Sequence, residues 1–219
     1  MDPWALLQLA DSGLPTGGFA HSGGLEAALQ LERYAGTVGL VRFVEEALWN
    51  VGGSALPFVA AGHLAPERLP DLDRRCEATL PSSVANRASR LQGQAFLRAA
   101  AAGYPLKVAP IGLELEQARS PGHFAPVFGA VLGLLGASGQ EARRLFLFQA
   151  ARGILSAGVR LGVLGPLEAQ RLLAGAAETS VAVLAATAGR TVLEAASTSP
   201  LLDLWQSHQD RLYSRLFRS

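Results

Sequence analysis

Cysteine and charged side chains are both scarce in this sequence. Cys76 is the single cysteine among 219 residues, so no disulfide forms within the chain, and a reducing compartment such as the cytoplasm is expected. Charged residues make up 17% of the chain and apolar residues 49%, whereas about a quarter of the residues in an average domain are charged. This balance argues against intrinsic disorder and leaves a folded protein that either has a large core or exposes apolar surface to a partner, and we favour the second.

The chain also lacks the charge and the apolar length that would indicate nucleic-acid or membrane binding. Nineteen basic and eighteen acidic residues give a net charge of +1, which excludes the strongly basic footprint of a nucleic-acid-binding domain. Residues 120–140 carry no charge, but their continuous apolar run, 124–137, is 14 residues long, short of the about 20 that cross a bilayer. We therefore expect a buried helix there and no membrane span. No basic segment precedes an apolar run after Met1, so we expect no signal peptide.

Side chains suited to metal binding or catalysis do not cluster in the sequence. The histidines His21, His63, His123 and His208 are far apart, and no cysteine pair accompanies them, which argues against a tightly bound metal cofactor. His63 and His123 are interpreted as ordinary polar or capping residues, whereas His21 and His208 are kept as candidates for a site across the fold. His21 adjoins Ser22, but no third residue completes a nucleophile–base arrangement. We therefore predict that the protein is not an enzyme.

Helical patterns run through most of the chain, and the alternation typical of strands is missing. Ser138 and Glu141 form a capping box ahead of an amphipathic run. Gly165–Pro166 is interpreted as a C′ glycine that ends one helix and a first-turn proline that begins the next. Pro200 marks a boundary before a short final helix. Residues 104–122 contain three prolines, which leaves a loop and a bent helix as alternatives.

These patterns predict an all-α fold in which residues 1–219 form a single domain, a bundle of roughly eight to ten helices. The glycine pairs Gly129/Gly133 and Gly158/Gly162 have four-residue spacing, so each would lie on one helix face and let another helix approach closely. The pairs favour tight packing inside the bundle. The alternative places Gly129/Gly133 at the contact of a two-fold homodimer.

A glycine-rich loop at residues 14–26 is the most unusual segment. It has four glycines within eight residues, ahead of a helix that we expect to begin at Leu25. Neither glycine motif of the nucleotide-binding folds is present, which argues against a nucleotide site. We predict that Gly17 or Gly18 adopts a positive φ, which only glycine tolerates easily. The residues assigned to this structural loop are Gly17, Gly18, His21, Ser22 and Glu26.

The C-terminal residues 201–219 combine large apolar side chains with arginines. Tyrosine, tryptophan and arginine are enriched at the energetic centres of protein interfaces, and water does not favour exposing so many apolar groups. We therefore expect this tail to dock, either on its own subunit or on a partner. The candidate partner-binding residues are His208, Arg211, Tyr213, Arg215, Leu216 and Phe217.

Three segments together resemble the UreF family of urease accessory proteins. Residues 7–26 (LQLADSGLPTGGFAHSGGLE) are similar to the N-terminal signature of that family, 123–129 (HFAPVFG) to its central segment and 213–219 (YSRLFRS) to its closing motif. Ala20–His21 stand where the family often has a Ser-Tyr pair, and Gln209 stands where its pattern has a histidine. The resemblance spans nearly the whole chain.

The resemblance implies a helical, homodimeric scaffold that binds the accessory protein UreD (UreH), recruits the GTPase UreG and docks on apo-urease. GTP hydrolysis by UreG then releases nickel for urease, so the assembled complex handles the metal and this chain binds no cofactor tightly. Two alternatives stay open. One is an activator or regulator of UreG, in which Arg211 or Arg215 acts as an arginine finger. The other is a helical enzyme of unknown reaction around the glycine loop and His21.

Overall fold

The computed structural model describes residues 1–31, 33–34 and 36–219, and the regular secondary structure in these ranges is all helical. Within these ranges there are eleven α-helices and no strand, which confirms the all-α prediction and exceeds the predicted eight to ten helices. The count was too low because the shortest helices have too few turns to show an apolar period. The helices are α1 (Pro3–Ala10), α2 (Leu25–Gln30), α3 (Gly36–Ser54), α4 (Leu56–Leu64), α5 (Leu69–Thr79), α6 (Ser83–Gly103), α7 (Pro105–Gln117), α8 (Phe124–Leu134), α9 (Gly139–Arg160), α10 (Pro166–Ala186) and α11 (Pro200–His208).

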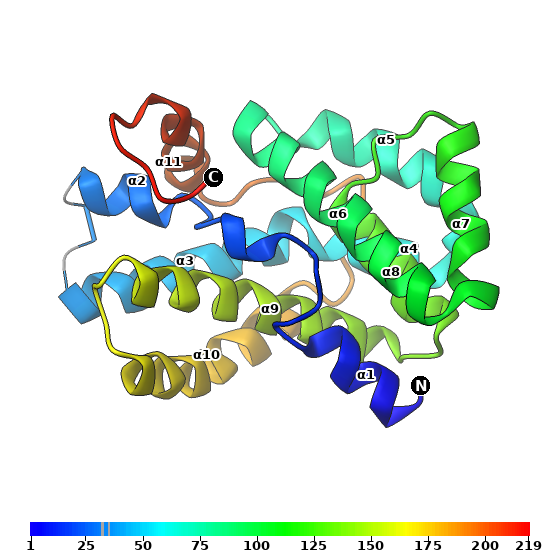
Figure 1. The fold of residues 1–219 in the computed structure, drawn as a ribbon, viewed down its shortest axis with the longest axis horizontal. Helices are drawn as coiled ribbons and strands as arrows, with labels where there is room; N and C mark the ends of the chain where they lie inside the picture. Colours follow the sequence, from blue (N-terminus) through cyan, green and yellow to red (C-terminus); the bar gives the residue numbers. More distant parts are fainter. Residues whose placement is uncertain (32, 35) are drawn as a thin grey trace.

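Helix α8 lies in the core, with α4, α5, α6 and α9 packed around it (Figure 1). Every residue from Ala125 to Leu132 is buried. A helix that is apolar on all sides is stable in a folded protein only when other elements surround it. The buried helix predicted from the uncharged run is therefore confirmed. No helix among the described residues combines the length and the apolarity that would let it cross a membrane.

Glycines bring α8 into backbone contact with α4. A Cβ atom added at Gly129 would clash with the carbonyl oxygen of Val59, and one added at Gly133 would lie 2.5 Å from that of His63. These backbones can approach so closely only because neither glycine has a side chain. The predicted packing inside the bundle is confirmed for this pair. The alternative that Gly129/Gly133 form a dimer contact is wrong, because α4 already covers them.

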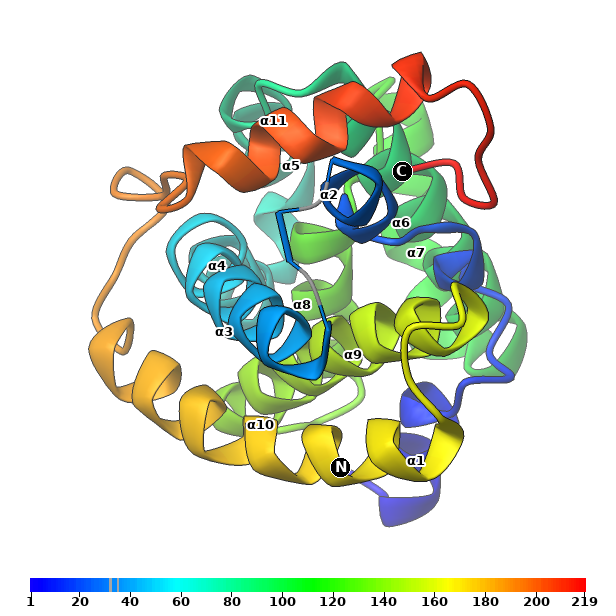
Figure 2. The same cartoon turned by 90° about the vertical axis from the view of Figure 1, so that its left-hand side faces the viewer.

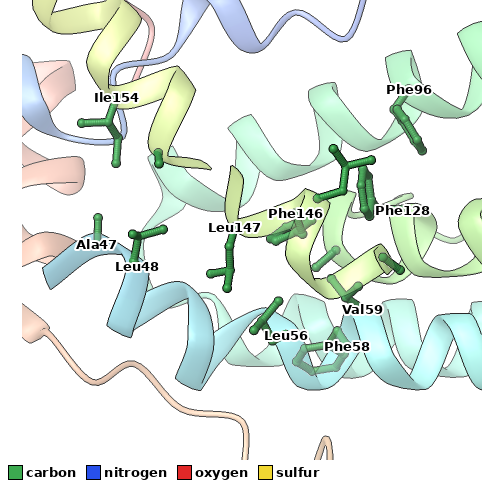
Figure 3. Packing of buried hydrophobic residues seen from close by; sticks show 14 of the residues in the cluster. Ala47, Leu48, Leu56, Phe58, Val59, Phe96, Phe128, Phe146, Leu147 and Ile154 are labelled. Carbon is green, nitrogen blue, oxygen red and sulfur yellow. The ribbon is translucent and has the colours of Figure 1, made fainter. Parts of the chain in front are cut away.

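Aromatic rings fill the space between α8 and its neighbours (Figure 3). The Phe128 ring lies 5.1 Å from that of Phe96 on α6 and 5.2 Å from that of Phe146 on α9, measured between centroids. Phe124 completes the cluster, 5.5 Å from Phe128. Offset and edge-to-face pairs at such distances contribute about 0.5–1.5 kcal/mol each beyond their burial. The aromatic cluster therefore joins α8 to α9, which follows it in the chain, and to α6, which is more distant in sequence.

The predicted helix starts are mostly confirmed, but one helix end is wrong. The Ser138–Glu141 capping box is present at the start of α9. The C′ glycine of α9 is Gly162, with φ +72°, and not Gly165, whose φ of −81° places it at the N-cap of α10. The error arose because Gly165–Pro166 matches both a helix end and a helix start, and only the start is used. Gly158 and Gly162 therefore do not share one helix face.

The remaining predictions concern residues 104–122 and the helix that begins at Pro200. Residues 104–122 are mostly helix α7, which keeps Pro110 in its interior, so the helical alternative holds there. Pro200 begins α11 as predicted. Figure 2 shows α11 beside α2, and the chain after α11 then returns towards the segment that precedes α2. The N-terminal loop and the C-terminal tail thus lie together.

Candidate functional site

The glycine loop and the C-terminal tail form one structural feature, called here the loop–tail unit (residues 17–26 and 209–219). The Ser22 hydroxyl and the Ser22 backbone N–H both donate to the main-chain oxygen of Ser219, the hydroxyl at 2.8 Å. The Arg218 N–H donates to the Ala20 carbonyl at 2.8 Å. The tail therefore docks on its own subunit, which is one of the two predicted outcomes.

The Glu26 carboxylate lies at the centre of this unit. Its side chain is on the first turn of α2 and the residue is only 3% exposed. One oxygen accepts the Leu216 N–H at 2.6 Å, and the other accepts the Phe217 N–H at 3.1 Å and the Gln209 side-chain amide at 2.6 Å. A buried carboxylate is stable only when donors replace the lost water. Glu26 therefore fixes the tail to the loop through three hydrogen bonds.

Glycines shape the loop that receives the tail. Gly17 has φ +73° and Gly24 has φ +88°, so the predicted positive φ is confirmed at Gly17. Gly18 has no positive φ, and a Cβ added there would lie 3.4 Å from the nearest heavy atom. The constraint expected at Gly18 belongs instead to Gly24, where an added Cβ would lie 3.0 Å from the backbone N of Gln206 on α11.

An arginine from α9 contacts aromatic rings of both the tail and the loop. Phe217 is 2% exposed, and the Arg160 guanidinium lies 4.1 Å from the centroid of its ring. The same guanidinium lies 3.6 Å from the ring centroid of Phe19, in the loop. A cation positioned over an aromatic face contributes about 0.5–2 kcal/mol, depending on how far it is desolvated. Arg160 thus joins the loop and the tail to the helical body.

His21 is held in its neutral form. Burial, followed by the positive charges of Arg218 and Arg87, lowers its pKa from 6.5 to about 4. Its Nδ1 lies 2.7 Å from the Ser219 hydroxyl, which can donate to an unprotonated ring nitrogen. The Ser22 hydroxyl is engaged by Ser219 rather than by His21. The adjacent His21–Ser22 pair therefore lacks the geometry of a nucleophile and its base.

Four of the other predicted tail residues are exposed, whereas His208 is half-buried. Tyr213 is fully exposed, and Leu216 and Arg211 are also exposed. Arg215 donates to Asp210 at 2.6 Å, and Arg87 of α6 donates to the same carboxylate at 2.9 Å. These two hydrogen bonds lower the pKa of Asp210. The tail thus has an inner side that packs and an outer side that faces solvent.

The histidines are dispersed in space as well as in sequence. His208 is half-buried at the end of α11. His63 bonds to the Ala137 carbonyl at 2.7 Å, and the buried His123 is the N-cap residue of α8. Nε2 of His123 lies 2.6 Å from the Glu77 carboxylate. Within the described ranges, no three side chains of the metal-binding types converge.

The sequence grouped some site residues correctly and missed others. The structural loop and the tail were each identified, but their contact was not. Gln209 was interpreted only as a departure from a pattern, whereas its amide is buried against Glu26. Arg160 and Arg87 were missed because they come from α9 and α6, far from both ends of the chain. An acid at position 26 between apolar residues was the one signal of a buried polar contact.

These features define the class as an all-helical protein that folds its tail onto its N-terminal loop and exposes aromatic and arginine side chains there. The sequence model of the UreF family matches residues 36–177, and the chain belongs to that family. Urease accessory protein F of Arabidopsis thaliana is 39% identical, over 99% of this chain and 92% of its own length.

Further relatives carry the same description. Urease accessory protein F of Oryza sativa subsp. indica is 38% identical over 98% of this chain and 84% of its own length. Urease accessory protein UreF of Mycobacterium tuberculosis (strain ATCC 25618 / H37Rv) is 33% identical, with 94% of both chains covered. The family model stops short of the loop–tail unit, whereas these alignments extend over nearly the whole chain.

Proposed function

We propose that this protein is a urease accessory protein that acts as a scaffold for GTP-dependent nickel insertion into apo-urease. In this proposal it binds UreD (UreH), and the pair recruits the GTPase UreG and docks on apo-urease in the cytoplasm. Nickel is the cargo of the assembly and not a resident cofactor of this chain. Membership of the UreF family and the names of its relatives support this role.

The loop–tail unit is the observation that carries the proposal. Tyr213 and Leu216 expose large apolar groups on a tail whose backbone Glu26 fixes. A side chain carried by a backbone that is already ordered loses less entropy on binding than one on a mobile segment. The tail is therefore proposed to supply part of the surface that UreD or UreG contacts.

We also propose that residues 1–219 form one domain and that two copies form a homodimer. The contact cannot use Gly129/Gly133, which pack inside the chain. Trp4 and Leu7 on α1 and Leu106 on α7 are exposed, and large apolar side chains of this kind are typical of surfaces that a partner covers. Light scattering at micromolar concentration tests the dimer, and a strict monomer would contradict it.

A second candidate function is activation of UreG by an arginine. Arg215 is engaged with Asp210, whereas Arg211 is exposed and makes no ion pair within the described part of the chain. An arginine supplied in trans accelerates GTP hydrolysis by about 10³–10⁵. UreG turnover measured with wild-type protein and with Arg211→Lys tests this role. If UreG turnover is the same with and without this chain, the activator role is refuted and only the scaffold role stays as a proposal.

Complementation is the direct test of the urease role. A urease-producing host that lacks its own UreF is supplied with this chain, and urease activity in extracts is measured. We expect activity to return with the wild-type chain and to stay absent with a variant that lacks Tyr213–Ser219. Failure of the wild-type chain to restore activity, despite soluble expression beside its cognate UreD and UreG, would refute the proposal.

A further inference from the structure

A groove of about 720 Å³ runs between α3 and α10. Figure 2 shows these two helices side by side, and the chain that leads from α10 to α11 adds Thr198 and Ser199 to the lining of the groove. One wall is the exposed Trp49 of α3, and the other is formed by small residues of α10, including Gly175. A side chain at Gly175 would meet no atom within 4 Å, so the groove is open there.

The charges that line the groove are mostly negative. Glu45 and Glu46 come from α3 and Glu178 from α10, against one positive residue, Arg42. Glu46 is already engaged, because it accepts Arg42 Nε at 2.7 Å and the Tyr34 hydroxyl at 2.5 Å. Glu45 and Glu178 are exposed and make no hydrogen bond or ion pair within the described residues. The groove therefore keeps two carboxylates that form no ion pair with any residue the structure describes.

Besides the two carboxylates, the groove contains a second group that can bind a cation, the side chain of Trp49. Trp49 is 42% exposed, although an indole gains more free energy from burial than most side chains. The ring lies in the same groove as the unpaired carboxylates. Tryptophan is the best aromatic acceptor for a guanidinium or ammonium group stacked on its face, and a guanidinium also makes paired hydrogen bonds to a carboxylate.

We infer that this groove is a docking site for an arginine-bearing segment of a partner protein. The guanidinium of the segment stacks on Trp49 and bonds to Glu45 or Glu178, while the backbone of the segment lies over Gly175. Charge complementarity selects this occupant, because an acidic or purely apolar segment would leave both carboxylates without a partner. The inference does not depend on the proposed role in urease assembly.

The test measures binding of a minimal probe to the full chain. The probe is a short glycine–serine peptide that carries arginines, compared with the same peptide carrying uncharged citrullines. Titration calorimetry is run on the wild-type protein, on E45Q/E178Q and on a matched control, E114Q/E116Q, which removes two exposed carboxylates from α7. We expect E45Q/E178Q to bind the arginine peptide about three- to ten-fold more weakly, the control to bind like wild type, and the citrulline peptide to bind to none of them.

A spectroscopic readout locates the probe. Trp4 is exposed and Trp205 is buried, so Trp4→Phe leaves Trp49 as the solvent-accessible tryptophan. We expect the arginine peptide to change the emission of this variant and the effect to weaken as salt is added. Equal affinity for all three proteins, equal binding of the citrulline peptide or an unchanged emission would overturn the inference. So would light scattering in which E45Q/E178Q alone falls from dimer to monomer, since the occupant would then be a second copy of this chain.

Discussion

Two contacts hold distant parts of this chain together, and they differ in kind. Where α4 meets α8, glycines let two backbones approach, and apolar groups fill the rest. In the loop–tail unit, one buried carboxylate receives three donors from the tail, and a cation lies between two rings. The first contact depends on volume, whereas the second depends on charge and on hydrogen-bond donors. The two should therefore respond to different perturbations.

The largest effect is expected where backbones touch. Gly129→Ala places a Cβ against the Val59 carbonyl, and neither backbone can move without separating α4 from α8. We expect a loss of about 3 kcal/mol or more in the free energy of unfolding, measured by urea denaturation. Gly153→Ala in α9 is the control, since its Cβ would meet no atom within 4 Å. The control should gain about 0.5–1 kcal/mol from helix propensity, and equal effects at the two sites would refute the volume argument.

Substitutions on the inner and outer sides of the tail should differ in their effect on the local stability of the tail. Phe217→Ala removes a buried ring and its contact with Arg160, and we expect it to cost about 3 kcal/mol of local stability. Tyr213→Ala removes a fully exposed ring and should stay within about 0.5 kcal/mol of wild type. Hydrogen exchange of the amides at 214–219 measures both. Similar exchange rates in the two variants would contradict an inner and an outer side.

Glu26→Gln tests the polar centre of the loop–tail unit at constant volume. An amide NH₂ cannot accept the Phe217 or Gln209 donors that one carboxylate oxygen accepts now. We expect the local stability of the tail to fall by about 2 kcal/mol. This loss should be seen as faster exchange at the Leu216 and Phe217 amides, while the amides of α8 stay protected. The control is Glu116→Gln, an exposed acid on α7. Unchanged exchange at Leu216 and Phe217 would show that Glu26 does not hold the tail.

The smallest effect is expected from pH, and it should be confined to the loop–tail unit. The His21 pKa is lowered from 6.5 to about 4 by burial, Arg218 and Arg87, so the unfolded chain binds the proton more tightly than the folded one. The contribution of His21 is fully present above pH 6.5 and is lost as pH falls towards about 4. We expect this contribution to the free energy of unfolding to be of order 1 kcal/mol, because the partial exposure of His21 weakens it. Proteolysis of the tail across this range should be pH-dependent in wild type and flat in His21→Gln.

The regular parts of the fold were predictable because their causes are local. The capping box at Ser138, the first-turn proline at Pro200 and the apolar run of α8 act within one or two helical turns. The helix pattern and the apolar run depend on the sequence within a short window. Helix number was less accurate, since α1 and α4 span only eight and nine residues.

The site was predictable only in parts because its contacts span the chain. Glu26 and Leu216 are 190 positions apart, and no periodic pattern links residues across such a distance. The meaning of each glycine also depends on its neighbour. Gly24 is constrained by Gln206 of α11, whereas Gly18 has only ordinary contacts, although both occur in the same short loop. Resemblance to a family pointed to both segments without indicating that they touch.

Capture of UreD and UreG by a chain with altered outer tail residues tests whether the tail is a partner-binding surface. Tyr213→Ala combined with Leu216→Ala removes two exposed side chains and leaves the Leu216 N–H and the buried Phe217 in place. Purified wild-type and variant proteins are compared for co-purification with UreD and with UreG, alongside thermal unfolding of each chain alone. We expect an unchanged melting temperature and a loss of at least about ten-fold in capture of one partner, as for an interface hot spot. Undiminished capture of both partners by the well-folded variant would contradict it.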